Sequence, residues 1–430
     1  MRKSLIYKCA ISVALLLSGW SVKAQTEGTY SGYSPYSVFG PGILHQGGTA
    51  WNRGMGGVGI AARSHRFVNT MNPASVTARD SLSFMANLGV SGQTTYIAEG
   101  SKKNLSTTVD INDFVISFPM WRHTAFMVGL VPVSDVGYSI SSSETNVYTG
   151  SHTFMSQGNG GIYQLFAAAG VTFWDRLSLG AQFNYNFGNI NKKASDVYED
   201  DSYRNSSSGD SLQVRNFSAK LGLQYEQPIG KSSFITLGAT YKFATRISGY
   251  SIHYRELGSY ARERSSTTLA ESNLSMGDEM SFGLSYRNGD SFLVEFDYTR
   301  TDWSRSGMDL VRGFSNRGES IFAPSVGQSF RAGFEFTPNR NDIRYYMRRC
   351  TYRAGAYFDQ SYYTVDGAHV NAIGVTVGMT LPVFRGYNGI TIGLDFGRRG
   401  LQKSQLNENY MGFSVGFNVF DIWFQKRPYE

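Results

Sequence analysis

Alternation of apolar and polar residues with a period of two dominates this sequence from residue 81 onward. In a clear example, apolar residues share one face of a segment and small or polar residues share the other: Leu177, Leu179, Ala181, Phe183, Tyr185 and Phe187 against Ser178, Gly180, Gln182, Asn184 and Asn186. This period is typical of β-strands whose two faces meet different surroundings. Such segments, about fourteen in number, centre near residues 88, 114, 129, 168, 182, 220, 239, 283, 295, 332, 355, 376, 394 and 416.

The connections between these segments alternate in length. Every second one is tight, as at Trp121-Arg122-His123 and Asn288-Gly289-Asp290, whereas others are long and polar, such as 199–210, 256–278 and 301–319. Short turns at one end and long loops at the other are typical of outer-membrane barrels, whose short turns face the periplasm. An even strand number then puts both termini on the periplasmic side. Residues 338–349 depart from the pattern, because this connection on the short side is long and Arg-rich, and we expect a small periplasmic helix there.

The fold class follows from what a bilayer allows. Lipid offers no hydrogen-bond partners, so a sheet crosses a membrane only by closing on itself. Aromatic residues make up 14% of the chain, and several stand at strand ends, where interface girdles lie: Trp121, Trp174, Tyr225, Tyr286, Phe384 and Trp423. We therefore expect an all-β protein, a transmembrane antiparallel β-barrel of about fourteen strands. The alternative is a large secreted β-sandwich or propeller, which also alternates but lacks the one-sided loop asymmetry.

The N-terminus has the features of a cleaved secretory signal, expected over residues 1–24. A positively charged start precedes the apolar run Cys9 to Trp20, and Val22-Lys23-Ala24 is a small-x-small cleavage site. Export together with the barrel pattern predicts the outer membrane of a Gram-negative bacterium, with outer-membrane lipid around the protein. Residues 25–78 lack strand periodicity and are expected to form an N-terminal segment, and residues 79–430 the barrel.

Several functional classes are not supported by the sequence. The 40 Lys+Arg and 33 Asp+Glu residues give a net charge of only +7 without a basic block, so a nucleic-acid partner is not expected. The six histidines are scattered, which argues against a metal site. Gly54 to Gly59 formally matches GxGxxG, but it lacks the strand and helix of a dinucleotide site, so no cofactor is expected. No nucleophile motif indicates an enzyme.

Charged residues are also expected on the inner face of the barrel. Glu295 and Asp297 share one strand, Arg331 and Glu335 the next, and Arg353 the one after. If strands adjacent in sequence pair, these residues form a cross-strand ladder of opposite charges. Two interpretations remain open: ion pairs that stabilise a wet lumen, or a site where Arg331 or Arg353 meets an anionic headgroup.

The stretch from Arg53 to Ala61, followed by Asn72-Pro73-Ala74-Ser75, resembles the N-terminal hatch of the long-chain fatty-acid transporter (FadL/TodX-like) family. The resemblance implies a fourteen-stranded barrel plugged by its N-terminal segment. It also implies hatch and gating roles for Gly54, Gly56, Gly57, Gly59, Asn72, Pro73 and Ala74. The family's box usually continues with Gly or Ala, where this chain has Ser75.

The function that the resemblance implies is passive uptake of hydrophobic small molecules, such as long-chain fatty acids. The ligand would enter past extracellular loops, reach a site beside the hatch and leave through a gap in the wall. Tyr30, Tyr33, Tyr36 and Phe39 are expected to cover the periplasmic mouth. The aromatic last strand, with Phe417, Trp423 and Phe424, resembles the signal read by the barrel-assembly machinery, although six residues follow Phe424.

Two other functions compete with uptake. One is a non-transporting barrel that acts as a scaffold or partner-binding subunit of a secretion or surface-attachment machine. The other is a general porin, which the long N-terminal segment disfavours. An apolar cavity beside the hatch would favour uptake, whereas a filled lumen with an apolar patch on the loops or wall would favour the scaffold.

Overall fold

The computed structural model describes residues 32–79, 82–99, 102–121, 123–146, 150–200, 202–257, 261–268, 274–311, 321–383, 388–401 and 406–422. The expected signal at residues 1–24, the aromatic Tyr30 and the C-terminal Trp423 and Phe424 lie outside these ranges. Within them, no helix has both the length and the apolar character needed to cross a membrane.

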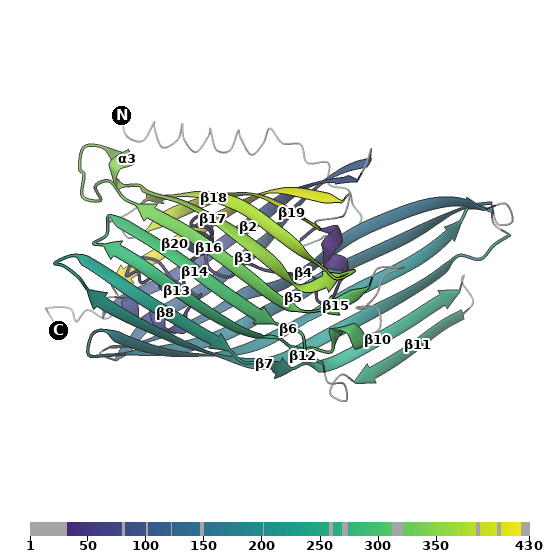
Figure 1. The fold of residues 1–430 in the computed structure, drawn as a ribbon, viewed down its shortest axis with the longest axis horizontal. Helices are drawn as coiled ribbons and strands as arrows, with labels where there is room; N and C mark the ends of the chain where they lie inside the picture. Colours follow the sequence, from purple (N-terminus) through teal and green to yellow (C-terminus); the bar gives the residue numbers. More distant parts are fainter. Residues whose placement is uncertain are drawn as a thin grey trace, which may run out of the picture.

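Fourteen antiparallel strands form a closed ring (Figure 1). In order round the ring they are β2 (Ser83–Glu99), β3 (Lys102–Trp121), β4 (Thr124–Asn146), β5 (Gly150–Phe173), β6 (Leu177–Tyr198), β7 (Ser206–Pro228), β8 (Ser233–Lys242), β13 (Asp278–Asn288), β14 (Phe292–Asp302), β16 (Val326–Phe336), β17 (Thr351–Val365), β18 (Ala368–Pro382), β19 (Gly389–Leu401) and β20 (Asn407–Ile422). Pairing of β2 with β20 closes the ring. Each predicted strand centre lies in one of these strands, so the barrel prediction is confirmed.

The burial pattern of the wall is the reverse of that in a soluble sheet. Phe217 and Leu221 on β7 are 59% and 48% exposed, whereas Ser218 and Gln224 on the same strand are 4% and 0% exposed. Apolar side chains face outward and polar ones inward, as a lipid-facing wall requires. Trp174, at a strand end, is 83% exposed, which suits an interface girdle.

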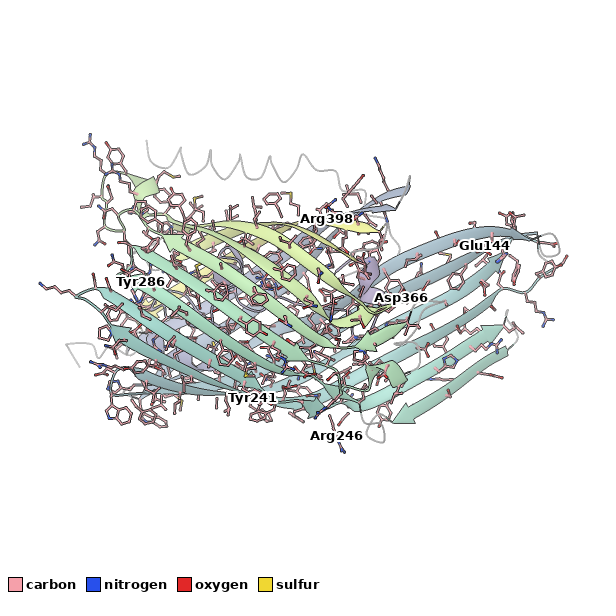
Figure 2. The ribbon with its side chains drawn as sticks, viewed as in Figure 1. Glu144, Tyr241, Arg246, Tyr286, Asp366 and Arg398 are labelled. Atoms are coloured by element: carbon pink, nitrogen blue, oxygen red, sulfur yellow. The ribbon has the colours of Figure 1, made fainter. Side chains whose placement is uncertain are left out.

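The wall is much taller on one side. Strands β4 to β7 have 22 to 24 residues, whereas β13, β14 and β16 have 11. About 9–11 residues suffice to cross a bilayer. Beyond the end of β8, β10 (Ser248–Leu257) pairs with the far half of β7, and β11 (Ala261–Thr268) pairs with β10. We call this projecting sheet, which consists of the far halves of β4 to β7 together with β10 and β11, the raised wall. Glu144 lies near its tip, far from Tyr286 at the short-turn end (Figure 2).

The raised wall corrects one expectation about the loops. Residues 256–278, expected as a long loop, contain β11 and β12 (Ser275–Met276). In addition, the β17–β18 hairpin at this end is tight, with only residues 366–367 between the strands. Polar strands, as well as loops, therefore build this end of the molecule.

The wall also contains a seam. β3 pairs with β4 only from Phe114 opposite Leu130 to Trp121 opposite Thr124. On the raised-wall side of these pairs, residues 102–113 of β3 and 131–146 of β4 are not paired with each other. Instead, β1 (Ile43–Leu44) from the N-terminal segment pairs with Ser134 and Asp135 of β4.

The remaining elements are short. They are the 3-10 helices η1 (Pro35–Val38), η2 (Pro73–Ala78) and η4 (Met308–Leu310), the helices α2 (Ala50–Arg53) and α3 (Tyr346–Arg349), and the strands β9 (Thr245–Arg246) and β15 (Phe322–Pro324). α3 lies in the Arg-rich connection between β16 and β17, so the predicted small helix is confirmed there.

A lipid-facing position on β7 tests the membrane orientation of the wall. We expect Leu221→Arg to lower the free energy of unfolding in vesicles by about 2–4 kcal/mol, because a charge then faces hydrocarbon. The measurement is urea-induced unfolding in phospholipid vesicles, with Leu221→Ala as the control for lost packing. Equal stability of the Arg and Ala variants would contradict the placement of this face against lipid.

Candidate functional site

Residues 32–79, here called the N-terminal segment, run through the inside of the ring. Tyr36 donates a hydrogen bond to the carbonyl of Leu406, which precedes β20 (2.8 Å). Near the opposite end of the barrel, the Thr77 hydroxyl contacts Ser178 at the start of β6 (3.1 Å). Between these points, α2 contacts β18, β19 and β20, while η2 contacts β4, β5, β6 and β7. The segment therefore touches the wall on opposite sides and crosses the lumen between them.

The start of the segment lies at the mouth opposite to the expected one. Tyr33, Tyr36 and Phe39 were expected at the short-turn mouth, but Tyr33 donates to the carbonyl of Ser139 in the raised wall (3.2 Å). Phe39 stacks on Phe322 with 5.9 Å between ring centroids. Tyr36 and Phe39 are buried in an apolar cluster that also contains Phe322, Tyr138 of β4 and Ile162 of β5, and this burial is the physical reason for the placement. Gly32 and Ile422, the first and last described residues, consequently lie at opposite ends of the barrel.

Pairs of wall glycines make room for the segment. They face each other across neighbouring strands: Gly180 and Gly222, Gly238 and Gly283, Gly333 and Gly355, Gly378 and Gly393. A Cβ on Gly378 would lie 2.9 Å from the Cα of Gly54, and one on Gly333 would lie 2.5 Å from the Cγ of Met55. Real Cβ atoms do not approach so closely, so the segment backbone lies directly on the wall backbone. We call these paired residues the glycine belt.

The glycines of the segment complement the belt. Gly56 and Gly57 have φ angles of 70° and 74°, a conformation that strongly favours glycine. The N–H of Gly56 donates to the hydroxyl of Thr376 on β18 (2.7 Å). Hatch and gating roles were expected for these glycines and for Gly54 and Gly59. In the structure Gly56 and Gly57 provide turn geometry, and Gly54 lies in close contact with Gly378 of the wall.

Two carboxylates on β14 hold the turn that follows. Asp297 accepts hydrogen bonds from the N–H groups of Gly59 (2.7 Å) and Ile60 (3.0 Å). Glu295 accepts from those of Ala61 (2.6 Å) and Ala62 (2.8 Å). Both carboxylates are almost fully buried. Four successive backbone donors are therefore satisfied by two wall side chains, and we call this arrangement the carboxylate clamp.

The other predicted lumen charges also contact the segment. Glu335 accepts from the indole N–H of Trp51 (2.7 Å) and pairs with Arg353, its cross-strand neighbour (2.8 Å). Arg331 stands opposite Asp297 in register, yet its guanidinium pairs with Asp359 at 2.7 Å. It also donates to the carbonyl of Gly56 (3.0 Å). The structure thus brings all five predicted charged residues to one region of the lumen.

Asn72, Pro73 and Ala74 form the joint between segment and wall. Asn72 is extended (φ −127°, ψ 119°), as expected before proline, and its side chain accepts from the N–H of Ala74 to cap η2. Its amide group donates to the carbonyls of Ile60 (2.8 Å) and Leu223 on β7 (3.1 Å). The Ser75 hydroxyl, where the family box has Gly or Ala, donates to the carbonyl of Asn72 (2.7 Å).

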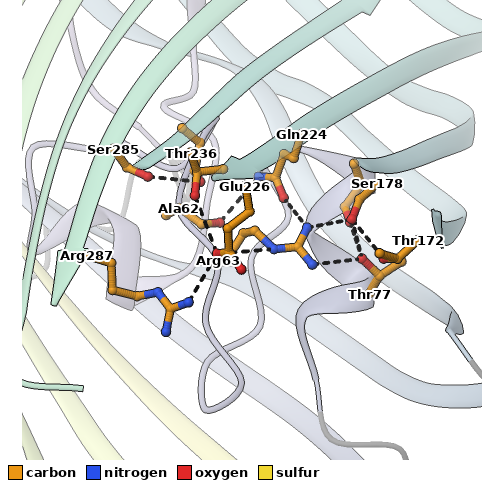
Figure 3. A network of polar contacts seen from close by, with 12 residues as sticks. Ala62, Arg63, Thr77, Thr172, Ser178, Gln224, Glu226, Thr236, Ser285 and Arg287 are labelled. Carbon is orange, nitrogen blue, oxygen red and sulfur yellow. Dashed lines mark hydrogen bonds and ion pairs between the residues drawn. The ribbon is translucent and has the colours of Figure 1, made fainter. Parts of the chain in front are cut away.

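Arg63 is a residue that sequence reasoning missed. Its guanidinium donates to Ser178 on β6 (2.8 Å) and Gln224 on β7 (3.0 Å), and to Thr77 (3.2 Å) of the segment itself (Figure 3). Glu226, which also pairs with Arg287, lies 3.8 Å away. Arg63 stands in a non-periodic stretch, and its partners come from separate strands, so no local pattern marked it.

A cavity of about 470 Å³ lies beside the segment. Its lining includes Phe166 and Trp303 but also many charged side chains, among them Asp110, Asp135, Lys220, Lys242, Glu279 and Arg331. Asp110 and Asp135 come from the two sides of the seam between β3 and β4, so the cavity reaches that seam. Lys220 and Lys242 stand directly opposite each other on β7 and β8.

Two further expectations concern the last strand and metals. Phe417 lies on the outward face of β20 and is 46% exposed, while Trp423 and Phe424 lie outside the described residues. Over the described ranges, no group of three or more His, Cys, Asp or Glu side chains could hold a metal ion.

The comparisons with known proteins agree on the fold. A family model described as BamG matches residues 5–430. The solved structures with this fold include the Pseudomonas putida toluene transporter TodX (14% identity, 89% of this chain and 100% of that chain covered, TM-score 0.59). They also include the Ralstonia pickettii toluene transporter TbuX (15%, 87% and 98%, 0.57) and a Pseudomonas aeruginosa FadL homologue (12%, 88% and 99%, 0.54). No curated protein matches the chain.

At these identities the likeness shows the fold alone, which is the fold of outer-membrane channels. The predicted resemblance to FadL/TodX-like barrels is therefore confirmed at the level of architecture, while the family whose model matches carries a different name.

The glycine belt yields a prediction about the fit of the segment. We expect Gly378→Val to destabilise the packing of the segment by about 1–3 kcal/mol, because the new side chain overlaps Gly54. Limited proteolysis of the folded barrel should then cut the segment faster. Val377→Ala, the next residue on β18 and outward-facing, is the matched control. An unchanged cleavage rate in the Gly378 variant would contradict the close packing.

The carboxylate clamp yields a second prediction. We expect Glu295→Ala to leave two buried N–H groups without an acceptor, at about 1–3 kcal/mol for each. The temperature at which the folded barrel unfolds, read from its gel mobility, should fall clearly. Glu295→Gln keeps an acceptor oxygen and should fall less. If both variants unfold at the wild-type temperature, the clamp does not stabilise the protein.

Proposed function

Because the chain belongs to the BamG family, we propose that it serves as a closed, non-transporting outer-membrane barrel, a scaffold or partner-binding subunit of a larger membrane-protein machine. The observation that carries the proposal is the use of the lumen charges. Glu295, Asp297, Arg331 and Glu335 all bond the N-terminal segment. These bonds support a segment that stays in the lumen as part of the barrel.

The energetics of the clamp support a segment that stays in place. An ordinary intramolecular hydrogen bond contributes about 0.5–1.5 kcal/mol. Withdrawing the turn would break four of them at once and leave two carboxylates in a lumen without those donors. A ligand would need a comparable differential affinity to shift the segment.

The chemistry of the cavity also favours this function. Sites for apolar ligands are lined mostly by hydrophobic side chains with a few polar groups. Here Lys220, Lys242 and Glu279 line one side, and Asp110 and Asp135 stand at the seam. An apolar molecule in this cavity would desolvate Lys242 and the ion pair between Lys220 and Glu279 (3.3 Å).

The outside of the molecule offers surfaces for partners. The raised wall extends well beyond the length that a bilayer needs, and its last strand, β11, is paired with β10 alone among the described strands. Free strand edges are places where another chain can add a strand.

A second candidate function is passive uptake of hydrophobic small molecules such as long-chain fatty acids, with the segment as gate. The observation that favours it is the position of the cavity, which reaches a seam where β3 and β4 are not paired. A ligand could leave sideways through such a seam once β1 released Ser134 and Asp135. The fold shared with toluene transporters gives this candidate its remaining support.

A reversible cross-link between segment and wall distinguishes the two functions. A Cβ on Gly416 would lie 2.8 Å from the Cβ of Ala50, closer than the roughly 3.5–4.5 Å of a disulfide. Ala50→Cys/Gly416→Cys, in a Cys350→Ser background, therefore forms a disulfide only with a shift of about 1 Å between segment and wall, and non-reducing electrophoresis with mass spectrometry checks that the bond has formed. We expect the oxidised protein to keep its complex with partners, seen by native electrophoresis of its own membranes, and to support growth as the reduced protein does. The Cys350→Ser parent is the control.

If cells lacking the protein lose uptake of labelled oleate or toluene, and only the reduced form of the variant restores it, the segment gates a channel. The scaffold function would then be wrong and the second candidate correct.

A further inference from the structure

The connection between β16 and β17, residues 337–350, stands out at the short-turn end of the barrel; we call it the connector loop. The neighbouring turns there are much shorter, such as residues 289–291 between β13 and β14. In Figure 1 the loop and α3 project beyond the strand ends. A long loop at this end is unusual for a barrel, and no part of the proposed scaffold function so far uses it.

The connector loop has a defined structure. Asp342 accepts hydrogen bonds from the N–H groups of Arg344 (2.8 Å) and Tyr345 (2.7 Å), and these hold the pKa of the Asp342 carboxyl below its ordinary value. The N–H of Asn339 donates to the carbonyl of Arg348 (2.8 Å), and Tyr346 donates to that of Pro382 on β18 (3.0 Å). The loop is therefore closed on itself and tied to the next hairpin.

This ordered loop nevertheless exposes large apolar side chains. Ile343 is 93% exposed and Met347 is 55% exposed, with Tyr345 and Tyr346 close to half exposed. A rigid surface that presents Tyr, Met and Arg has the composition of the energetically dominant residues of protein interfaces. Because the loop is already ordered, a partner would lose little conformational entropy in ordering it.

The loop is also strongly basic. It contains four arginines and one aspartate, a net charge of +3. In the part of the chain that the structure describes, Arg344 and Arg349 form no ion pair; they lie over the rings of Tyr345 (5.3 Å) and Tyr346 (5.1 Å). Charges held in this way remain available to an acidic partner.

The loop is connected to the N-terminal segment through Asp290. Arg340 of the loop pairs with Asp290 at 2.6 Å, and His65 of the segment lies 3.6 Å from the same carboxylate. Partial burial would raise the pKa of Asp290, but the positive charges of Arg66, His65 and Arg340 outweigh it and hold that pKa below the ordinary value. The loop therefore has a fixed position relative to the closed lumen.

From these observations we propose that the connector loop is a docking surface for a protein partner that presents acidic side chains around an apolar pocket, on the side of the membrane that the short turns face. Ile343 and Met347 fill the pocket, and Arg344, Arg348 and Arg349 meet the acidic rim. A protein fits better than a lipid surface, because a guanidinium group lies over a face of each tyrosine ring and its charge would have to enter the bilayer together with the ring. This proposal rests on the proposed partner-binding function.

Site-specific photocross-linking in intact cells tests the proposal. A photoreactive phenylalanine at position 343 should give one discrete protein adduct, and mass spectrometry should map the contact to a segment rich in Asp and Glu. Reversing the rim charges, in Arg344→Glu/Arg348→Glu/Arg349→Glu, should lower the adduct yield by about tenfold or more. The same probe at Ile229, an exposed position on the β7–β8 turn at this end, is the control. Gel mobility checks that each variant is a folded barrel.

Three outcomes overturn the proposal: no adduct, an adduct to phospholipid only, or a protein adduct whose yield the charge reversal leaves unchanged. A partner complex that survives charge reversal would remove the connector loop from the interface and leave the proposed scaffold function standing. Absence of any partner complex would remove both.

Discussion

The interaction on which the rest of the structure depends is the carboxylate clamp. A barrel in lipid can turn apolar side chains outward without cost, but every polar group that it turns inward needs a partner. Glu295 and Asp297 on β14 and the backbone N–H groups of residues 59–62 satisfy one another. Neither the carboxylates nor the turn would be stable at this depth alone.

The glycine belt makes the clamp possible. Hydrogen bonds of this length require the turn to lie against the strands, and a side chain on Gly238 or Gly283 would push it away. Several strands of the wall thus carry glycine at these positions, and the backbone of the segment packs directly on the backbone of the strands. The toluene transporters share the fold, but a shared fold leaves the contents of the lumen free to differ. In this chain the contents are charged and are used to hold the segment.

Much of the barrel could be predicted from the sequence, because a period of two is a local signal. All fourteen strand centres were identified, since lipid-facing residues such as Phe183 and Leu221 alternate with inward polar ones. The far halves of β4 to β7, together with β10 and β11, were missed. At the tip of β4 both faces of the sheet are exposed, so the run Ser141-Ser142-Ser143 shows no alternation.

The site was predictable only in part, for a related reason. Asn72-Pro73 was identified because proline and its predecessor have strong local preferences. The five lumen charges were identified as inward-facing, but their partners depend on strand register and on the path of the segment. Strand register and the path of the segment are not encoded in neighbouring residues. The contacts of Arg63 and the end of the barrel at which Tyr36 lies could therefore not be predicted from the sequence.

The central claim, that residues 32–79 are a fixed part of the barrel, is tested most directly by hydrogen exchange. The measurement compares the amide N–H groups of residues 59–62 with those of β14 in the folded protein in lipid nanodiscs. A fixed segment predicts that both sets exchange equally slowly, because they are released only when the barrel opens. Rapid exchange at residues 59–62 beside a protected β14 would show that the segment leaves its carboxylates in the native state, and it would contradict the account.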